Sequence, residues 1–346
     1  MFFLIILLTV ILFIFYKKRE DFKDYKSLIV TPQQTIYNDI TLNTFYKGSF
    51  YEKIAKNFST IYPITNINYT KGSQSNIELT NKKDNHLSLI QEDILLSFMR
   101  NNPKNNVRFI SCVGIEQLTL VVPFNSKINK LENIKTIGTL NNKSGSYITL
   151  KKILEAFQIE SKIVNLDIND ITNKFKLNQI DAFFIITSHP CHIIKSLHNR
   201  FPIKFLSLSY LNKDIFTKIF PFSKTSIIDT QLYNINSNIV IETINSKILL
   251  ICNKNLKKND GYNLIKTIFS NFSYIKHSGN DDYKMKMKDF NPAELYLDNS
   301  TYILHKGVKN YYIDIGIITY SDNHSCKYYV GIKKCPNKKL NHFRLL

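Results

Sequence analysis

The sequence contains the stretch Thr70-Lys71-Gly72-Ser73-Gln74-Ser75-Asn76-Ile77, which joins a short apolar run to a segment with helical spacing. A second stretch of the same kind reads Asn142-Lys143-Ser144-Gly145-Ser146-Tyr147. In both stretches glycine permits a tight turn and serine supplies a helix cap, so each predicts a strand-to-helix turn. The free amides at a helix start, together with the helix dipole, favour a bound anion. Helix capping explains either turn alone, whereas the pair indicates a shared anion site.

Around these turns short apolar runs alternate with helical patterns, which predicts an α/β protein. The first series is expected as strands at residues 40–46, 66–70 and 87–91 and helices at 51–58 and 76–81. The second is expected as strands at 117–123, 136–140, 162–166 and 181–187 and helices at 147–157 and 168–177. A β-rich stretch at 239–252 and a helix at 261–272 cross back, which predicts two lobes with a hinge. Ligands of open α/β sheets bind beyond the carboxyl ends of the strands, where the two turns should face each other.

The composition favours an anionic partner without identifying it. Lys and Arg number 46 against 27 Asp plus Glu, which gives a formal net charge of +19. Only ten Gly and no Trp, with abundant Asn, Ile and Lys, are typical of an AT-rich coding sequence, which explains part of the Lys excess. We therefore do not expect nucleic acid as a partner. The 44% of hydrophobic residues supply ample material for a core.

The first residues of the chain, Met1 to Tyr16, form an uncharged apolar run that ends at Lys17-Lys18-Arg19. The run is slightly shorter than the roughly 20 residues of a full span, and the following Lys side chains can reach the interface. We predict an uncleaved single-pass transmembrane anchor rather than a signal peptide, because no basic segment precedes the run and no cleavage site follows it. Residues 17–37 are expected as a tether. The basic cluster after the run favours a cytoplasmic position for the rest of the chain, which is the reverse of an exported protein. The side of the membrane is therefore left open.

Motifs of enzymes and metal sites are missing from the sequence. It contains no Gly-x-Gly-x-x-Gly, Walker loop, His-Glu-x-x-His or Gly-x-Ser-x-Gly, so we expect neither an enzyme nor a cofactor. The five Cys include no Cys-x-x-Cys pair, and His189 beside Pro190 and Cys191 is interpreted as a loop rather than a metal site. The tail predicts a hairpin in which Cys326 and Cys335 are close enough to bridge in an oxidising compartment.

Five short motifs, in order along the chain, carry a family resemblance. They are Thr70–Ile77, Leu89–Asp93, Ile137-Gly138 with Ser144-Gly145-Ser146, Ile180–Phe184 with Pro190, and Leu304–Gly316. In these motifs the chain resembles the TAXI-type solute-binding receptors of TRAP transporters, which have the two-lobed type II periplasmic binding protein fold. The similarity runs from about Asn43 to Gly316. Two departures are a first loop with one glycine, Gly48, and no proline, and Asn178 in place of a turn glycine.

The resemblance implies an exported receptor that captures a small carboxylate, an amino acid such as glutamate or a dicarboxylate, for a membrane permease. The anchor predicted from residues 1–16 would make this receptor membrane-anchored. The ligand-binding residues then expected are Gly48, Tyr51, Gly72, Ser73, Gln91, Ser144, Gly145, Ser146 and His189. The expected division is anchor 1–16, tether 17–37, lobe 1 at 38–133 and 236–316, lobe 2 at 134–235, and a C-terminal β-hairpin extension at 317–346. The alternative is a structural or interaction protein, for instance a viral membrane protein, that keeps this fold without transport.

Overall fold

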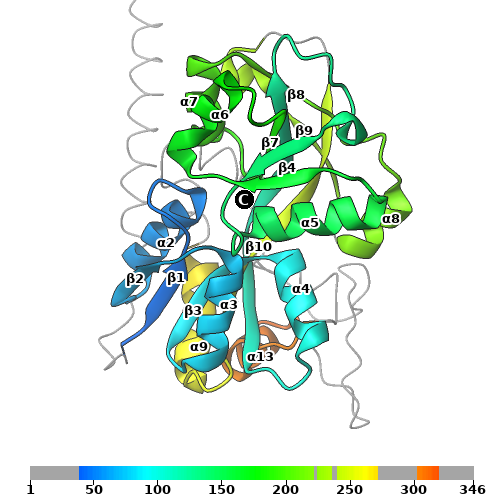
Figure 1. Ribbon diagram of the computed structural model, residues 1–346. Helices are drawn as coiled ribbons and strands as arrows, with labels where there is room; N and C mark the ends of the chain where they lie inside the picture. The colour runs from blue at the N-terminus through cyan, green and yellow to red at the C-terminus, as the bar shows by residue number, and fades with distance from the viewer. Residues whose placement is uncertain (1–38, 222–223, 236–239, 272–301, 319–346) are drawn as a thin grey trace, which may run out of the picture.

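The computed structural model describes residues 39–221, 224–235, 240–271 and 302–318, which form two α/β lobes (Figure 1). The predicted anchor, the tether, Cys326 and Cys335 lie outside the described residues. So does the predicted hairpin, except for residues 317–318. Within the described ranges, no helix has the length and apolar character that crossing a bilayer requires.

The first lobe is built on a sheet whose strands follow the order β2-β1-β3-β10-β4. Strand β1 (Thr41–Thr44) lies between β2 (Asn66–Tyr69) and β3 (His86–Gln91) and is parallel to both. The helices of this lobe are α2 (Phe50–Ile61), α3 (Ser73–Lys82), α4 (Glu92–Asn101), α9 (Lys258–Ser270) and α13 (Lys306–Asp314). The parallel order brings the carboxyl ends of β1, β2 and β3 to the same edge of the sheet, which faces the second lobe (Figure 1).

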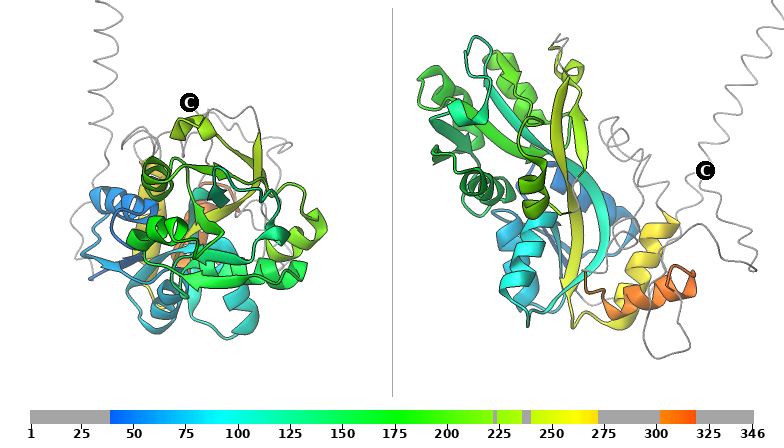
Figure 2. Two further views of the ribbon diagram at one scale, coloured as in Figure 1. Left: turned by 45° about the horizontal axis from the view of Figure 1, so that its top comes forward. Right: turned by 90° about the vertical axis from the view of Figure 1, so that its right-hand side faces the viewer.

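Two long strands, β4 (Val107–Pro123) and β10 (Ile241–Asn253), run through both lobes, as the right-hand view of Figure 2 shows. They pair antiparallel from Asn245 opposite Gln117 to Asn253 opposite Val107. Beyond Gln117, β4 pairs with strands of the second lobe. The first crossing therefore lies within β4, whose residues 118–123 pair with strands of the second lobe.

The second lobe continues the sheet through β7 (Ala182–Thr187), β5 (Thr136–Thr139) and β6 (Lys162–Asn165). Strands β8 (Ile203–Phe205) and β9 (Thr225–Ile228) pair with β4 and β10. Its helices are α5 (Gly145–Phe157), α6 (Ile171–Lys176), α7 (His192–Arg200) and α8 (Lys213–Ile219), with short 3-10 turns at Leu131–Asn133, Ile168–Asp170 and Thr230–Tyr233. Asn178 has a φ of 50°, which is the left-handed conformation expected of it.

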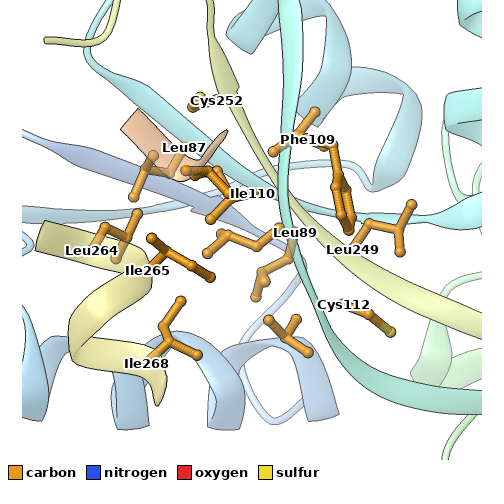
Figure 3. Close-up of a cluster of buried hydrophobic side chains, with 14 of the residues drawn as sticks. Leu87, Leu89, Phe109, Ile110, Cys112, Leu249, Cys252, Leu264, Ile265 and Ile268 are labelled. Atoms are coloured by element: carbon orange, nitrogen blue, oxygen red, sulfur yellow. The ribbon is translucent and has the colours of Figure 1, made fainter. Parts of the chain in front are cut away.

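Each lobe has its own hydrophobic core. In the first lobe, side chains from β3, β4 and β10 pack against Leu264, Ile265 and Ile268 of α9 (Figure 3). Phe109 stacks on Tyr302, with ring centroids 5.1 Å apart, and joins the segment before α13 to this core. Two further clusters form the core of the second lobe. Burial of apolar area stabilises each lobe independently, so the lobes can behave as two bodies on a shared pair of strands.

The predicted series lacks helices α4, α7 and α8 and strands β8 and β9, and it shortens strand β4. Helix α4 follows β3 directly, with Glu92 and Asp93 in its first turn, where carboxylates favour a helix start. Strand β4 begins at Val107 rather than at residue 117. Its first half is buried on both faces, so its side chains do not alternate between apolar and polar residues.

Candidate functional site

The two serine-glycine turns meet at the boundary between the lobes. Helix α3 starts at Ser73 in the first lobe and α5 at Gly145 in the second, and their ends lie next to each other (Figure 1). The amide of Gln74 donates to the Lys143 carbonyl oxygen at 3.2 Å, so the main chains of the two turns are in direct contact. Gly72 has a φ of 125°, and a Cβ on it would lie 2.8 Å from Ser144 Cα. Only glycine allows this approach.

A cavity of about 30 Å³ lies between the two turns. Of the predicted ligand-binding residues, those lining the cavity are Tyr51, Gly72, Ser73, Gln91, Ser144, Gly145 and Ser146. Phe45, Asn76, Glu116 and Ile186 complete the lining. A volume of about 30 Å³ has room for one or two water molecules, whereas pockets for small organic ligands measure roughly 300–1,000 Å³. The lobes must therefore separate before a solute can enter.

The serine hydroxyls at the cavity already accept hydrogen bonds from the protein. Ser73 Oγ accepts from the Gln91 amide at 3.1 Å, and Ser146 Oγ accepts from the Ile186 amide at 2.9 Å. Ser144 Oγ accepts from the Tyr147 amide at 3.2 Å and so caps α5. A hydroxyl that accepts one hydrogen bond still has its own proton to donate. These groups therefore suit an acceptor such as a carboxylate oxygen.

Glu116 of β4 was not predicted, although it lines the cavity with Tyr51. Its side chain is buried and accepts a hydrogen bond from the Tyr51 hydroxyl at 2.9 Å. Burial raises the pKa of Glu116 well above its usual range, more than the Tyr51 hydrogen bond lowers it. The cavity thus contains a carboxyl group whose protonated form is favoured by burial. A lone acidic residue inside an apolar run is the sequence signal that marks it, but the predicted strand began one residue later, at Gln117.

Two predicted ligand contacts, Gly48 and His189, are not part of the cavity lining. The Gly48 amide donates to the Glu52 carboxylate within the first lobe. Burial raises the pKa of Glu52, but hydrogen bonds from Gly48, Tyr69 and Lys56 together lower it to about 2.

His189 lies in the second lobe and is buried. Its Nε2 is 2.8 Å from Thr119 Oγ1, and its Nδ1 contacts the Tyr233 hydroxyl. Both ring nitrogens are therefore engaged within the lobe. Within the described ranges, no three His, Cys, Asp or Glu side chains come together as a metal site would require.

Replacing Gly72 by Ala is expected to separate the two turns. The new Cβ would overlap Ser144, and the backbone conformation at φ 125° costs an L-residue about 1–3 kcal/mol. Gly48→Ala is the matched control, because Gly48 also has a positive φ, 86°, but no atom lies within 4 Å of an added Cβ. Urea denaturation measures the loss of stability, and amide exchange at Gln74 measures the separation of the two turns. Equal protection of the Gln74 amide in both variants would contradict the contact between the turns.

Two α/β lobes joined by two crossing strands, with a small polar cavity at the carboxyl ends of their strands, define the periplasmic binding protein-like class. The chain belongs to the NMT1-like family, whose model matches residues 48–316. This is a family of substrate-binding receptors rather than enzymes. No curated protein matches the sequence.

Several solved structures are similar to this one. The periplasmic aliphatic sulphonate binding protein SsuA from Escherichia coli is 15% identical, with a TM-score of 0.45 over 80% of this chain and 83% of that one. MatC from Rhodopseudomonas palustris with bound malate is 10% identical, with a TM-score of 0.47 over 74% and 89% of the two chains. A TctC solute binding protein from Polaromonas is 12% identical, with a TM-score of 0.44 over 76% and 94%.

Proposed function

We propose that this chain is a membrane-anchored receptor of the TAXI type, which captures a small carboxylate such as glutamate between its two lobes. The observation that carries the proposal is the convergence of two helix starts, α3 and α5, on one cavity at the lobe boundary. Each helix start carries partial positive charge, and the two together favour an anion more than one does. Membership of a receptor family supports capture of a solute, while the carboxylate and the transporter type are our proposal.

In the proposed complex the lobes open, admit the solute and close on it. Hydroxyl protons of Ser73, Ser144 and Ser146 would donate to the carboxylate oxygens, and the carboxyl group of Glu116, in the protonated form that burial favours, would donate to a further acceptor. Hydrogen bonds to a charged ligand each contribute about 1.5–3 kcal/mol, so three or four suffice for micromolar affinity after the cost of closure. The side-chain amide nitrogen of Gln91 is already engaged within the protein, because Nε2 donates to Asp93 and Thr149.

We further propose that residues 1–16 anchor this receptor in a membrane through the tether at 17–37, and that a membrane permease reads the closed state. A receptor held at the bilayer by a short tether is kept at a high local concentration near such a permease. Closure about β4 and β10 changes the relative orientation of the lobes, and a partner that contacts both lobes can detect that change.

A second candidate function is that of an interaction module that keeps the receptor fold without binding a solute. The observation that favours it is the cavity of about 30 Å³, because the main chains of the two turns are in direct contact and leave little space for a solute. A module of this kind would present the closed pair of lobes to a protein partner. It would show no response to small acids.

A thermal-shift titration of the full-length protein in detergent separates the two functions. L-Glutamate, succinate and malonate are the acids to be tested, with succinamide as an uncharged analogue of succinate. A ligand at 100 times its dissociation constant adds about 2.7 kcal/mol to the free energy of unfolding, so an acid that binds should raise the melting temperature. Stabilisation by an acid and none by succinamide is the result expected of a carboxylate receptor. Failure of every acid to stabilise the protein would contradict the receptor and leave the interaction module.

A further inference from the structure

A buried polar cluster joins the two lobes beside the cavity. It consists of Gln91, Asp93 and Ser97 from the first lobe and Thr149 and Lys152 from α5 of the second, and we refer to it as the interlobe cluster. Asp93 is at its centre, with 1% of its side chain exposed. In Figure 1, α5 lies across the boundary above α4, which carries Asp93 and Ser97.

Each member of the interlobe cluster has a partner in the opposite lobe. Thr149 Oγ1 donates to Asp93 Oδ2 at 2.7 Å and accepts from Gln91 Nε2 at 2.7 Å. Lys152 Nζ lies 3.2 Å from Asp93 Oδ2 and donates to Ser97 Oγ at 2.7 Å. The carboxylate of Asp93 is thus satisfied by donors from α5 and by Gln91. All of these donors and acceptors belong to the protein, and none needs a solute.

The charge on Asp93 makes this contact selective for the closed arrangement. With the lobes together, the carboxylate is buried and depends on Lys152 and Thr149 for its hydrogen bonds. With the lobes apart, water replaces both partners. Removing one partner therefore destabilises the closed arrangement, in which the carboxylate would stay buried and incompletely paired, and leaves the open one unaffected.

The exposed ion pair between Lys143 and Glu78 also crosses the boundary, at 3.1 Å. Its side chains are 45% and 39% exposed, so water and salt screen it. The main-chain contact from Gln74 to Lys143 adds one further hydrogen bond. The buried cluster around Asp93 is consequently the contact that distinguishes the closed from the open arrangement most strongly.

We propose that the interlobe cluster around Asp93 holds the two lobes closed in the absence of any solute. Closure is then a resting state of this protein, and any solute or partner that uses the boundary must first gain access by breaking the Asp93 contacts. If the chain is a receptor, its apparent affinity is reduced by the small fraction of molecules that are open at any moment. The inference stands on contacts within the protein and does not require the proposed carboxylate.

Amide exchange on the full-length protein without added solute tests this proposal. The amide of Gln74 is the direct reporter, because its acceptor, the Lys143 carbonyl, lies in the other lobe. In the wild type this amide should be protected. In Lys152→Met, which removes the cation and keeps the apolar stem, we expect its exchange to be at least tenfold faster, since opening becomes more frequent.

Lys151→Met is the matched control. Lys151 precedes Lys152 on the same helix, is 61% exposed and, among the residues that the structure describes, forms its ion pair within α5, with Glu155. In Lys151→Met the Gln74 amide should exchange at the wild-type rate. Amides at residues 107–113, deep in the first lobe, should stay protected in both variants and thereby exclude global unfolding. If Lys152→Met also loses protection at residues 107–113, Thr149→Val replaces it as the test variant, because this change removes one hydroxyl and keeps the shape of the side chain.

Two outcomes would overturn the proposal. One is a Gln74 amide that exchanges without protection in the wild type, because the resting protein would then be open. The other is a Gln74 amide that is equally protected in Lys152→Met and in the control Lys151→Met. If Lys152→Met unfolds globally, the same comparison is made between Thr149→Val and Lys151→Met. Both results can be obtained whether or not any acid binds, so failure of this proposal is distinguishable from failure of the carboxylate receptor.

Discussion

Replacing Ser146 by Asp is expected to abolish binding of any carboxylate that stabilises the wild type. Ser146 is at the start of α5 and lines the cavity. An Asp side chain there would occupy the anion site itself, because the helix start attracts it as it attracts a ligand. It would replace a donor hydroxyl by a negative charge. We expect a loss of at least 100-fold in affinity, since a charged hydrogen bond of about 1.5–3 kcal/mol is lost and a like-charge repulsion is added.

The matched control for this variant is Ser146→Ala, which removes the hydroxyl without adding charge. It leaves the Ile186 amide without its acceptor, so some loss of stability is expected in the control. Calorimetric titration measures affinity, and circular dichroism checks that both variants fold. If Ser146→Asp still bound the wild-type ligand with unchanged affinity, the carboxylate would not lie at the start of α5.

Replacing Glu92 by Gln is expected to remove a large part of the fall in stability between about pH 4.5 and pH 7. Glu92 is 4% exposed, and burial raises its pKa to about 7, although Lys247 and the hydrogen bond from Tyr302 lower it. Below pH 4.5 the carboxyl is protonated in the folded and the unfolded chain. Between pH 4.5 and 7 only the unfolded chain loses the proton, which favours unfolding.

A shift from 4.5 to about 7 corresponds to about 3 kcal/mol of stability, because each pKa unit is worth about 1.4 kcal/mol. At pH 8 the Gln variant should therefore be more stable than the wild type by about that amount. Urea denaturation at several pH values measures the difference. Burial raises the pKa of Glu116 too, so this carboxyl acts in the same direction, while Glu52, with a lowered pKa, destabilises the fold only as the pH falls below 4.5.

The control for the pH series is Glu155→Gln, because Glu155 is 65% exposed and, in the part of the chain that the structure describes, forms its ion pair with Lys151 of the same helix. The stability of Glu155→Gln should depend on pH in the same way as that of the wild type. A Glu92→Gln variant with the same pH dependence as the wild type would show that Glu92 does not hold its proton in the folded state.

The strands and helices that carry the two turns could be predicted because their signals are local. Small polar residues between an apolar run and a helical pattern placed the starts of α3 and α5 to within three residues. The closeness of the turns also followed from the general geometry of α/β sheets. The turn at Asn178 was predictable because so few residue types accept a positive φ.

Other features depend on contacts between distant residues and could not be predicted. Glu116 and Tyr51 are 65 positions apart, and their hydrogen bond exists only because β4 lies against α2 in the fold. The interlobe cluster likewise requires α4, which the sequence analysis missed. Gly48 was placed at the cleft by resemblance and His189 because it follows a second-lobe strand, whereas the structure gives their polar groups partners within a single lobe.

The pairing of β4 with β10 has a consequence for how the lobes can move. Because the two crossing segments are hydrogen-bonded to each other from Asn245 and Gln117 onward, they form a ribbon rather than two independent threads. A hydrogen-bonded ribbon bends readily across its flat face and resists shear in its own plane, since shear would break its ladder. The lobes should therefore swing along a single arc, with one soft degree of freedom. A molecule that recognises one position of the lobes along this arc therefore needs to distinguish only one interlobe angle.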